Sequence, residues 1–304
     1  MKKILLLETD QTQCFDETGN EINCNNTLQD AAFDKRKQSV HGRFHVVSEI
    51  VEDQWTGLFW SKHANLVGFP LTWKEALDFI EDINQSNRLG RDDWRLPARS
   101  DLFSLISHQH INPALPIGHP FENVFNGYYW SRTTCARLPD QAWYVHLGGA
   151  RVYRGMKHAS YLVWPVAGSK LEERYSGKDR FVLDDNLLFD RITDKVWYLG
   201  EELKNGPVSW NEAINNVKNI NEKRITPYHD WRLPNIRELE SLVDITGHSP
   251  ALACDCSFTN IQDGYWSATT SIYEPSYAWV LYTKDGAVGV GHKPHPDFFT
   301  LAVR

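Results

Sequence analysis

The end of the first half of the chain combines cationic and aromatic side chains in a pattern suited to an anionic ligand. Between residues 131 and 168 there are five basic residues and one acidic residue, Asp140, with Tyr144 and His146 interleaved. Guanidinium and ammonium groups beside aromatic rings can bind sulfate, carboxylate or phosphate groups even on an acidic protein. The alternative is a solvated strand face, or pairing with the acidic second half. The candidate ligand-binding residues are Arg132, Arg137, Arg151, Tyr153, Arg154, Lys157 and His158.

Two segments of the second half carry residue types that bind metal ions. Gly291–Asp297 contains two imidazoles and a carboxylate, but two prolines interrupt regular geometry and no fourth ligand is evident. Glu274-Pro-Ser276 is similar to the Glu-Pro-Asn motif of calcium-dependent lectins, but Ser cannot replace the carbonyl ligand that Asn supplies. We therefore expect no metal site and no cofactor.

The five cysteines and the remaining motifs favour binding over catalysis. Cys14 and Cys24 flank a turn-forming stretch and could face each other across a hairpin as a disulfide. Cys254-x-Cys256 is too tight for a usual zinc pair, and with Cys135 these thiols are interpreted as free or structural. The chain has no Gly-x-Ser-x-Gly elbow, His-Glu-x-x-His or phosphate-binding Gly loop. We therefore expect no enzyme activity.

These candidates lie in a duplicated chain. Asp-Trp-Arg-Leu-Pro occurs at residues 93–97 and again at 230–234, 137 positions later, and ten of the twelve tryptophans form matched pairs. Residues kept in both copies usually hold the core, so function is better sought where the copies differ. We expect each Arg of the motif to pair with its neighbour, Asp93 or Asp230, or with loop carbonyls. The predicted structural residues are Trp94, Arg95, Trp130, Trp143, Trp231, Arg232, Trp266 and Trp279.

The duplication divides the chain into four parts. Residues 1–44 form an N-terminal extension with short strands predicted at 4–7 and 13–15. Residues 45–168 are the first repeat, 169–180 a charged linker and 181–304 the second repeat.

Each repeat shows the same order of local signals. Thr72-Trp-Lys-Glu75 and Ser209-Trp-Asn-Glu212 are capping boxes that begin an amphipathic helix, and a second helix is expected after the Pro of the repeated motif. Together with several antiparallel strands, this predicts an α+β fold with two helices and a small sheet per repeat. The predicted strands are 129–131, 142–147 and 161–166 in the first repeat, and 265–267, 278–282 and 299–303 in the second.

Composition limits the partners and the location of the protein. The 304 residues are 41% hydrophobic with net charge −7, and the second repeat carries −6 of it, so nucleic acid is not expected as a partner. No apolar run reaches the roughly 18 residues of a membrane helix. Met1-Lys-Lys3 and the apolar residues after it resemble the start of an export signal, but the stretch ends at Glu8. If that start is native, the protein is expected in the cytoplasm.

Trp-Arg-Leu-Pro before a Leu-rich helix, followed by Gly-Tyr-(Tyr)-Trp-Ser and a closing strand, resembles the Lcl C-terminal domain family in two tandem copies. The segment from Gln11 to Cys24 is similar to one that often precedes such domains in exported bacterial proteins. The resemblance implies a C-type-lectin-like fold, related to that of formylglycine-generating enzymes, in secreted or surface-anchored proteins. The best-known member is a collagen-like adhesin whose domain binds sulfated glycosaminoglycans as a trimer. This chain has no Gly-x-y region, and it is acidic where a heparin binder is basic.

We therefore expect a non-catalytic, adhesin-like protein, secreted or held in the bacterial cell envelope, that recognises a glycan or a surface protein. One alternative is an enzyme related to the formylglycine-generating fold, which would need Cys254 and Cys256 as a reactive pair. Another is a structural envelope component.

Overall fold

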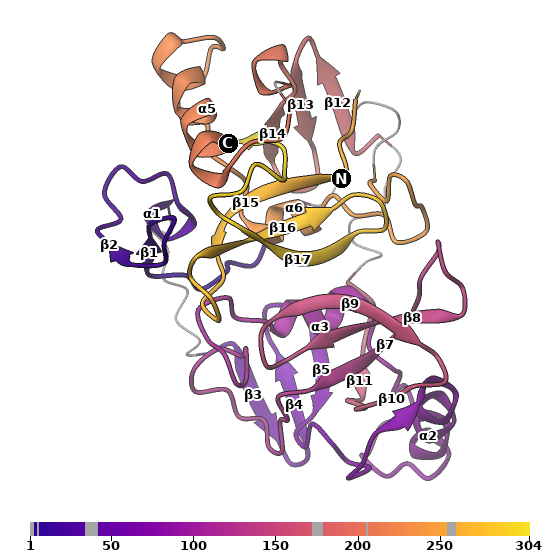
Figure 1. Cartoon of the computed structure of the whole chain (residues 1–304). Helices are drawn as coiled ribbons and strands as arrows, with labels where there is room; N and C mark the ends of the chain where they lie inside the picture. The colour runs from indigo at the N-terminus through magenta and orange to yellow at the C-terminus, as the bar shows by residue number, and fades with distance from the viewer. Residues whose placement is uncertain (1–2, 5, 34–41, 172–178, 205, 254–259) are drawn as a thin grey trace. The chain divides into compact units, whose positions relative to one another are not determined.

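The chain folds into two compact units, each built around one repeat. The computed structural model describes residues 3–4, 6–33, 42–171, 179–204, 206–253 and 260–304 (Figure 1). Residues 38–174 form one unit, and residues 1–37 together with 175–304 form the other. The N-terminal extension thus belongs with the second repeat. In the described part of the chain, no helix combines the length and apolar character needed to cross a membrane.

Each repeat opens with an antiparallel meander that its own last residues extend. The matching register places Trp60 opposite Val166 and Trp197 opposite Val303, so the end of each repeat closes on its beginning. In the first repeat the strands are β3 (Phe44–Val47), β4 (Ile50–Asp53), β5 (Leu58–Ser61) and β11 (Val166–Ala167). In the second they are β12 (Phe181–Asp184), β13 (Leu187–Asp190), β14 (Lys195–Tyr198) and β18 (Ala302–Val303).

The long helix of each repeat begins at its predicted capping box. Thr72 caps α2 (Trp73–Gln85) and Ser209 caps α5 (Trp210–Lys223), and in both boxes the hydroxyl and the Glu side chain satisfy backbone amides reciprocally. A short 3-10 helix, η1 (Glu201–Leu203), precedes α5. The apolar stripe of each helix is buried, as its helical spacing predicts.

The second helices also form where the motif predicts them, but they are short. They are α3 (Arg99–Leu105) and α6 (Ile236–Glu240). Each follows the Pro of the repeated pentapeptide, which disfavours helix in the residue before it.

A three-stranded antiparallel sheet completes each repeat, and its third strand was not predicted. The first repeat has β7 (Tyr128–Thr134), β8 (Gln141–His146) and β9 (Arg151–Met156), and a short pair of β6 (Leu71–Thr72) with β10 (Ser160–Tyr161). The second has β15 (Gly264–Thr270), β16 (Tyr277–Tyr282) and β17 (Ala287–His292). The single strands predicted at 161–166 and 299–303 are wrong in extent. In the first repeat Pro165, which has no N–H for a ladder, lies between β10 and β11.

The N-terminal extension forms a hairpin and one helical turn. Strands β1 (Cys14–Phe15) and β2 (Glu21–Ile22) are antiparallel, and a disulfide joins Cys14 to Cys24 beside them. The turn α1 (Asp30–Phe33) follows. The strand predicted at 4–7 is wrong for its described residues, which are not in a strand.

Tryptophan fills the core of both units. The six tryptophans for which we predict a structural role are all buried, and each is matched between the repeats. Both units also contain a buried ion pair at the same place. Arg43 lies 2.8 Å from Asp53, and Arg180 lies 2.6 Å from Asp190.

The two Arg residues of the repeated motif do not pair with the neighbouring acids. Arg95 binds Asp101 at 2.5 Å, and Arg232 binds Glu238 at 2.5 Å. Both acids are buried in the short helix that follows the motif, where solvent does not compete for the pair. Asp93 and Asp230, which are exposed, bind Arg91 and Arg304 instead. The predicted pairing within the pentapeptide is therefore wrong, whereas the alternative of contacts to carbonyls is confirmed: Arg95 donates to the Gly168 carbonyl and Arg232 to the Leu233 carbonyl, both at 3.1 Å.

Candidate functional site

Strand β9 distributes the predicted basic patch over two faces of its sheet. Side chains alternate along a strand, so Arg151 and Tyr153 lie on one face while Val152 and Arg154 lie on the other. Val152 is fully buried, and the Arg154 guanidinium approaches the Trp143 ring at 5.9 Å. The long side chain of Arg154 nevertheless reaches Tyr153, because its guanidinium lies 4.6 Å from the centre of the Tyr153 ring.

Lys157 occupies a position that both repeats share. Its ammonium lies 4.2 Å from the centre of the Trp73 ring, and its carbonyl accepts a hydrogen bond from the Trp73 backbone N–H. In the second repeat Lys293 makes the same two contacts with Trp210, again with 4.2 Å between ammonium and ring. The duplication therefore assigns Lys157 a role in packing on the long helix.

The remaining patch residues lie at the ends of strands. Arg132 is exposed on β7, and His158 is exposed in the turn after β9. Arg137 is half-buried in the turn between β7 and β8. The structure does not bring these three together with Arg151 and Tyr153.

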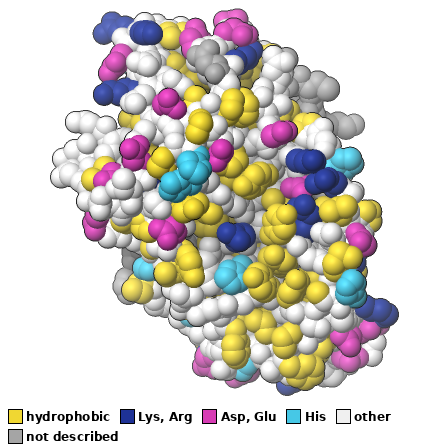
Figure 2. Space-filling model, viewed as in Figure 1, with side chains coloured by type: hydrophobic (Ala, Val, Ile, Leu, Met, Phe, Trp, Pro, Cys, Tyr) yellow, Lys and Arg dark blue, Asp and Glu magenta, His cyan; other side chains and the backbone are white. Residues whose placement is uncertain are grey.

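Four tyrosines cluster on the face that carries Arg151, and we call them the tyrosine face: Tyr128, Tyr144, Tyr153 and Tyr161. Tyr144 is central. Its ring centre lies 4.8 Å from that of Tyr128, 5.1 Å from that of Tyr161 and 6.5 Å from that of Tyr153. Tyr128 and Tyr153 expose 43% and 42% of their surface. Hydrophobic side chains, tyrosine included, gather over β7 to β10 in Figure 2.

Strand pairing positions these rings. Tyr144 lies directly opposite Tyr153, and His146 lies opposite both Tyr128 and Arg151. Side chains directly opposite on antiparallel strands are close enough to contact each other. Gly155 allows the fourth ring to approach, because a Cβ there would lie 2.6 Å from the ring of Tyr161.

The second repeat does not reproduce the tyrosine face. The same registers place Gly264 where Tyr128 stands, Val280 where Tyr144 stands and Gly289 where Tyr153 stands. Phe298 takes the place of Tyr161 and lies 4.9 Å from Trp266. The shared fold therefore forms in the second repeat without a tyrosine at any of these four positions.

Two guanidinium groups lie beside the tyrosine face: that of Arg151, and that of Arg154, which is 4.6 Å from the Tyr153 ring. Burial is the main cause that raises the pKa of Tyr144 to about 12, with neighbouring tyrosines adding to it. Burial, assisted by Arg151, lowers the pKa of His146. At neutral pH the face therefore presents the uncharged hydroxyl of Tyr144 and the neutral imidazole of His146 beside the guanidinium groups of Arg151 and Arg154. Among the described residues, none is hydrogen-bonded to the hydroxyl of any of the four tyrosines.

The candidates in the second repeat are placed differently. The rings of His292 and His295 are 4.6 Å apart, and His295 lies 3.8 Å from Asp297. No group of three or more potential metal-ligating side chains occurs within the part of the chain that the structure describes. The Ser276 hydroxyl donates to Glu274 at 3.1 Å.

The cysteines are only partly described. Cys135 is a buried thiol, and Cys14 and Cys24 form the disulfide of the N-terminal hairpin. Cys254 and Cys256 lie outside the described residues.

Sequence reasoning missed the two tyrosines at the ends of the tyrosine face. Tyr128 and Tyr161 lie 33 positions apart, and the bridge between Tyr129 and Leu162 brings their ring centres to 5.3 Å. A signal was present, since both differ from their counterparts Gly264 and Phe298.

Comparison with known proteins identifies the repeats. The family model described as Lcl C-terminal domain matches residues 49–167 and again residues 186–304. No curated protein matches the chain.

Proposed function

We propose a function on the premise that the chain belongs to the Lcl C-terminal domain family, of which it carries two copies. The protein is a non-catalytic, adhesin-like binding protein, and the tyrosine face of its first repeat binds a glycan with acidic substituents. The observation that supports this most directly is the restriction of four clustered tyrosines to one of two otherwise matched repeats.

The chemistry of the tyrosine face fits a sugar ligand. Tyrosine offers a large, rigid surface with a hydroxyl for hydrogen bonding, at a low entropic cost of ordering. Tyr128 and Tyr153 are the most exposed of the four and are suited to stack on sugar rings. Arg151, opposite His146 at the same end of the strand pair, can form paired hydrogen bonds with a sulfate or carboxylate.

We further propose a C-type-lectin-like fold and a secreted or cell-envelope location. Among its described residues each repeat has one long and one short α-helix, with small antiparallel sheets and long irregular segments, of which 108–127 is one. Such segments often carry function on a rigid frame. The Cys14–Cys24 disulfide supports the location, because disulfides persist in oxidising compartments and are rare in the cytosol.

The test is to measure binding of sulfated and neutral oligosaccharides to the full chain and to the variants Tyr153→Ala and Arg151→Ala. We expect each substitution to weaken binding of the sulfated ligand about tenfold, which corresponds to the loss of one good contact. Calorimetry or a glycan array with purified protein provides the dissociation constants.

Matched controls lie in the second unit. Tyr273 is 64% exposed and Arg191 is exposed, so Tyr273→Ala and Arg191→Ala remove the same groups away from the tyrosine face. If the parent binds no glycan, or if the two pairs of variants behave alike, the proposal is wrong.

A further inference from the structure

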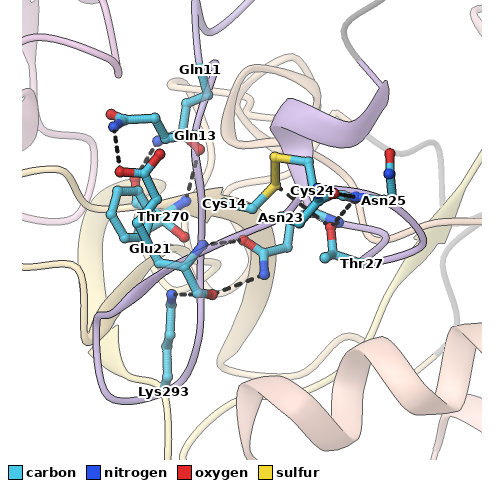
Figure 3. The surroundings of a disulfide bond; sticks show 12 residues. Gln11, Gln13, Cys14, Glu21, Asn23, Cys24, Asn25, Thr27, Thr270 and Lys293 are labelled. Atoms are coloured by element: carbon cyan, nitrogen blue, oxygen red, sulfur yellow. Dashed lines mark hydrogen bonds between the residues drawn. A yellow bond between two sulfur atoms is a disulfide. The ribbon is translucent and has the colours of Figure 1, made fainter.

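The N-terminal segment, defined here as residues 8–33, binds one face of the second repeat. The Gln11 side chain donates to the Thr270 carbonyl at 2.6 Å and accepts from the Thr270 N–H at 3.0 Å. Asp30 accepts a hydrogen bond from the Thr269 hydroxyl at 2.7 Å. The Lys293 side chain points toward the hairpin in Figure 3, and it donates to the backbone carbonyl of Asp16 at 3.1 Å. The segment therefore covers the end of β15 and the Lys–Trp contact of the second repeat.

The same contacts extend along the long helix and the repeated motif. The amide of Asn211, in the first turn of α5, donates to Glu17 at 2.6 Å. The guanidinium of Arg232 lies 5.5 Å from the centre of the Phe33 ring. The acidic side chain of Glu17 and the aromatic side chain of Phe33 thus contact the two ends of this face of the second repeat.

The equivalent face of the first repeat is open. Trp73 is half-buried where Trp210 is fully buried, and Thr134 is half-buried where Thr270 is buried. Lys157 is likewise more exposed than Lys293. The residues that hold the N-terminal segment in one repeat are therefore accessible in the other.

A groove of about 340 Å³ lies on this open face. Trp73, Leu77 and Ile80 of α2 line one part, and Arg95 and Arg132 line another. The apolar side chains that line it suit contact with an aromatic side chain, as Phe33, which is 37% exposed, contacts Arg232 in the second repeat. The groove shares no residue with the tyrosine face.

The basic side chains on the open face of the first repeat favour an acidic ligand in the groove. The stretch from Glu8 to Asp30 contains six acidic residues and no Lys or Arg. The face of the second repeat that it covers has two uncharged residues, Asn211 and Ala268, at the positions that matter here. The open face of the first repeat has Lys74 and Arg132 at those two positions. Lys74 now pairs with Asp78 on the surface, Arg132 is exposed, and Glu81 is the one carboxylate that lines the groove.

We infer that the groove of the first repeat is a docking site for an acidic polypeptide segment of another protein. That segment binds as this chain's own N-terminal segment binds the second repeat: an aromatic side chain enters the groove, and carboxylates face Arg132 and Lys74. The chain's own N-terminal segment is occupied within its own unit, so the ligand comes from a different molecule.

The probe is a synthetic peptide of residues 6–33 with Cys14 and Cys24 oxidised, added to the full chain. We expect saturable binding that Arg132→Ala weakens about tenfold, since this substitution recreates Ala268 of the second repeat and removes one charge-assisted contact. Arg191→Ala in the second unit is the matched control and should bind like the parent. A peptide with its six acids replaced by amides should bind at least about tenfold more weakly.

Four results would overturn the inference. The first is the absence of peptide binding at millimolar concentration, and the second is equal binding of the peptide by the parent and Arg132→Ala. The third is equal binding of the acidic and amide peptides by the parent. The fourth is self-association of the parent that Arg132→Ala abolishes. The last would identify a second copy of the chain as the occupant. Arg132 is exposed, so the fold should survive its loss, and an unchanged unfolding midpoint checks this.

The two proposals can fail separately. Arg151→Ala should weaken glycan binding and leave peptide binding unchanged. Arg132→Ala should do the reverse.

Discussion

Lys293 is the clearest case of a residue whose environment changes its chemistry. Its side chain is fully buried, and the ammonium lies between the N-terminal hairpin and the Trp210 ring. Burial is the dominant effect and lowers its pKa to about 7, while Asp16 acts in the opposite direction. The carbonyls of Phe15 and Asp16, at 3.4 Å and 3.1 Å, replace only part of the lost hydration.

We predict that Lys293 makes the protein more stable as the pH rises from about 7 to about 10. The unfolded chain, with the ordinary lysine pKa of 10.5, binds more protons in this range than the folded chain does. A single group of this kind adds at most about 1.4 kcal/mol per pH unit. Urea unfolding across this range should show the rise in the parent and its loss in Lys293→Met. An identical pH dependence in both proteins would contradict the assignment.

A second residue-scale prediction concerns the buried acid of the repeated motif. Burial favours the neutral form of Glu238, but Arg232 and Lys195 outweigh it and hold its pKa at about 2. Because this pKa is lowered on folding, the carboxylate contributes stability above its ordinary pKa of 4.5, and that stability is lost as the pH falls toward 2.

We expect Glu238→Gln to lower the free energy of unfolding at pH 7 by about 3 kcal/mol, because it leaves two cations without their partner. The loss should shrink below pH 4, and urea unfolding at pH 7 and pH 3 measures it. Glu240, two positions later in the same short helix, provides the control substitution Glu240→Gln. Equal effects of the two substitutions would show that Glu238 has no special role.

At the scale of elements, the disulfide hairpin holds the N-terminal segment in its bound form. Gln11 and Asp30, before and after the Cys14–Cys24 bridge in the sequence, both contact the second repeat, and Phe15 contacts it from within the bridged loop. Figure 3 shows the bridge with Gln11 and Thr270 near it. Closing a loop of this length removes conformations mainly from the unbound segment.

We predict that replacing both cysteines by serine loosens the N-terminal segment by about 2 kcal/mol. The amide of Thr270, which donates to Gln11, should then exchange its hydrogen faster in native conditions, by roughly thirtyfold at that energy. The amide of Thr134, its counterpart in the first repeat, should be unaffected. Equal changes at the two amides would mean that the disulfide acts on the whole chain.

At the scale of the whole molecule, the chain has two hydrophobic cores with a similar arrangement of residues. They differ because only one of them belongs to a unit that includes the N-terminal residues. Each repeat has its own cluster of buried tryptophan and aliphatic residues, one around Trp130 and one around Trp266. Only the unit of the second repeat includes residues 1–37. Because these two clusters are built from residues that recur in both copies, many of the repeated residues can be interpreted as structural.

The duplication itself, both capping boxes, the four main helices and the buried tryptophans could be predicted from the sequence. These features depend on residues a few positions apart, or on identity between copies. The third strands were missed because β9 was interpreted as a charged patch, although its alternation of exposed Arg151 and Tyr153 with buried Val152 is that of a strand. The basic patch itself was a partial guide: alternation along β9 places Arg151 and Arg154 on opposite faces of the sheet, although the Arg154 guanidinium lies 4.6 Å from the Tyr153 ring.

The sequence by itself therefore determined the repeats, their long helices and the tryptophans of their cores, because helix capping and periodicity are local. Only the tertiary structure decided that Arg95 and Arg232 pair with Asp101 and Glu238, and that four tyrosines form one face. It also decided that Gln11 meets Thr270, 259 positions away, so that one repeat is covered where the other is open. Contacts across such distances arise from packing of whole elements, and no local pattern encodes them.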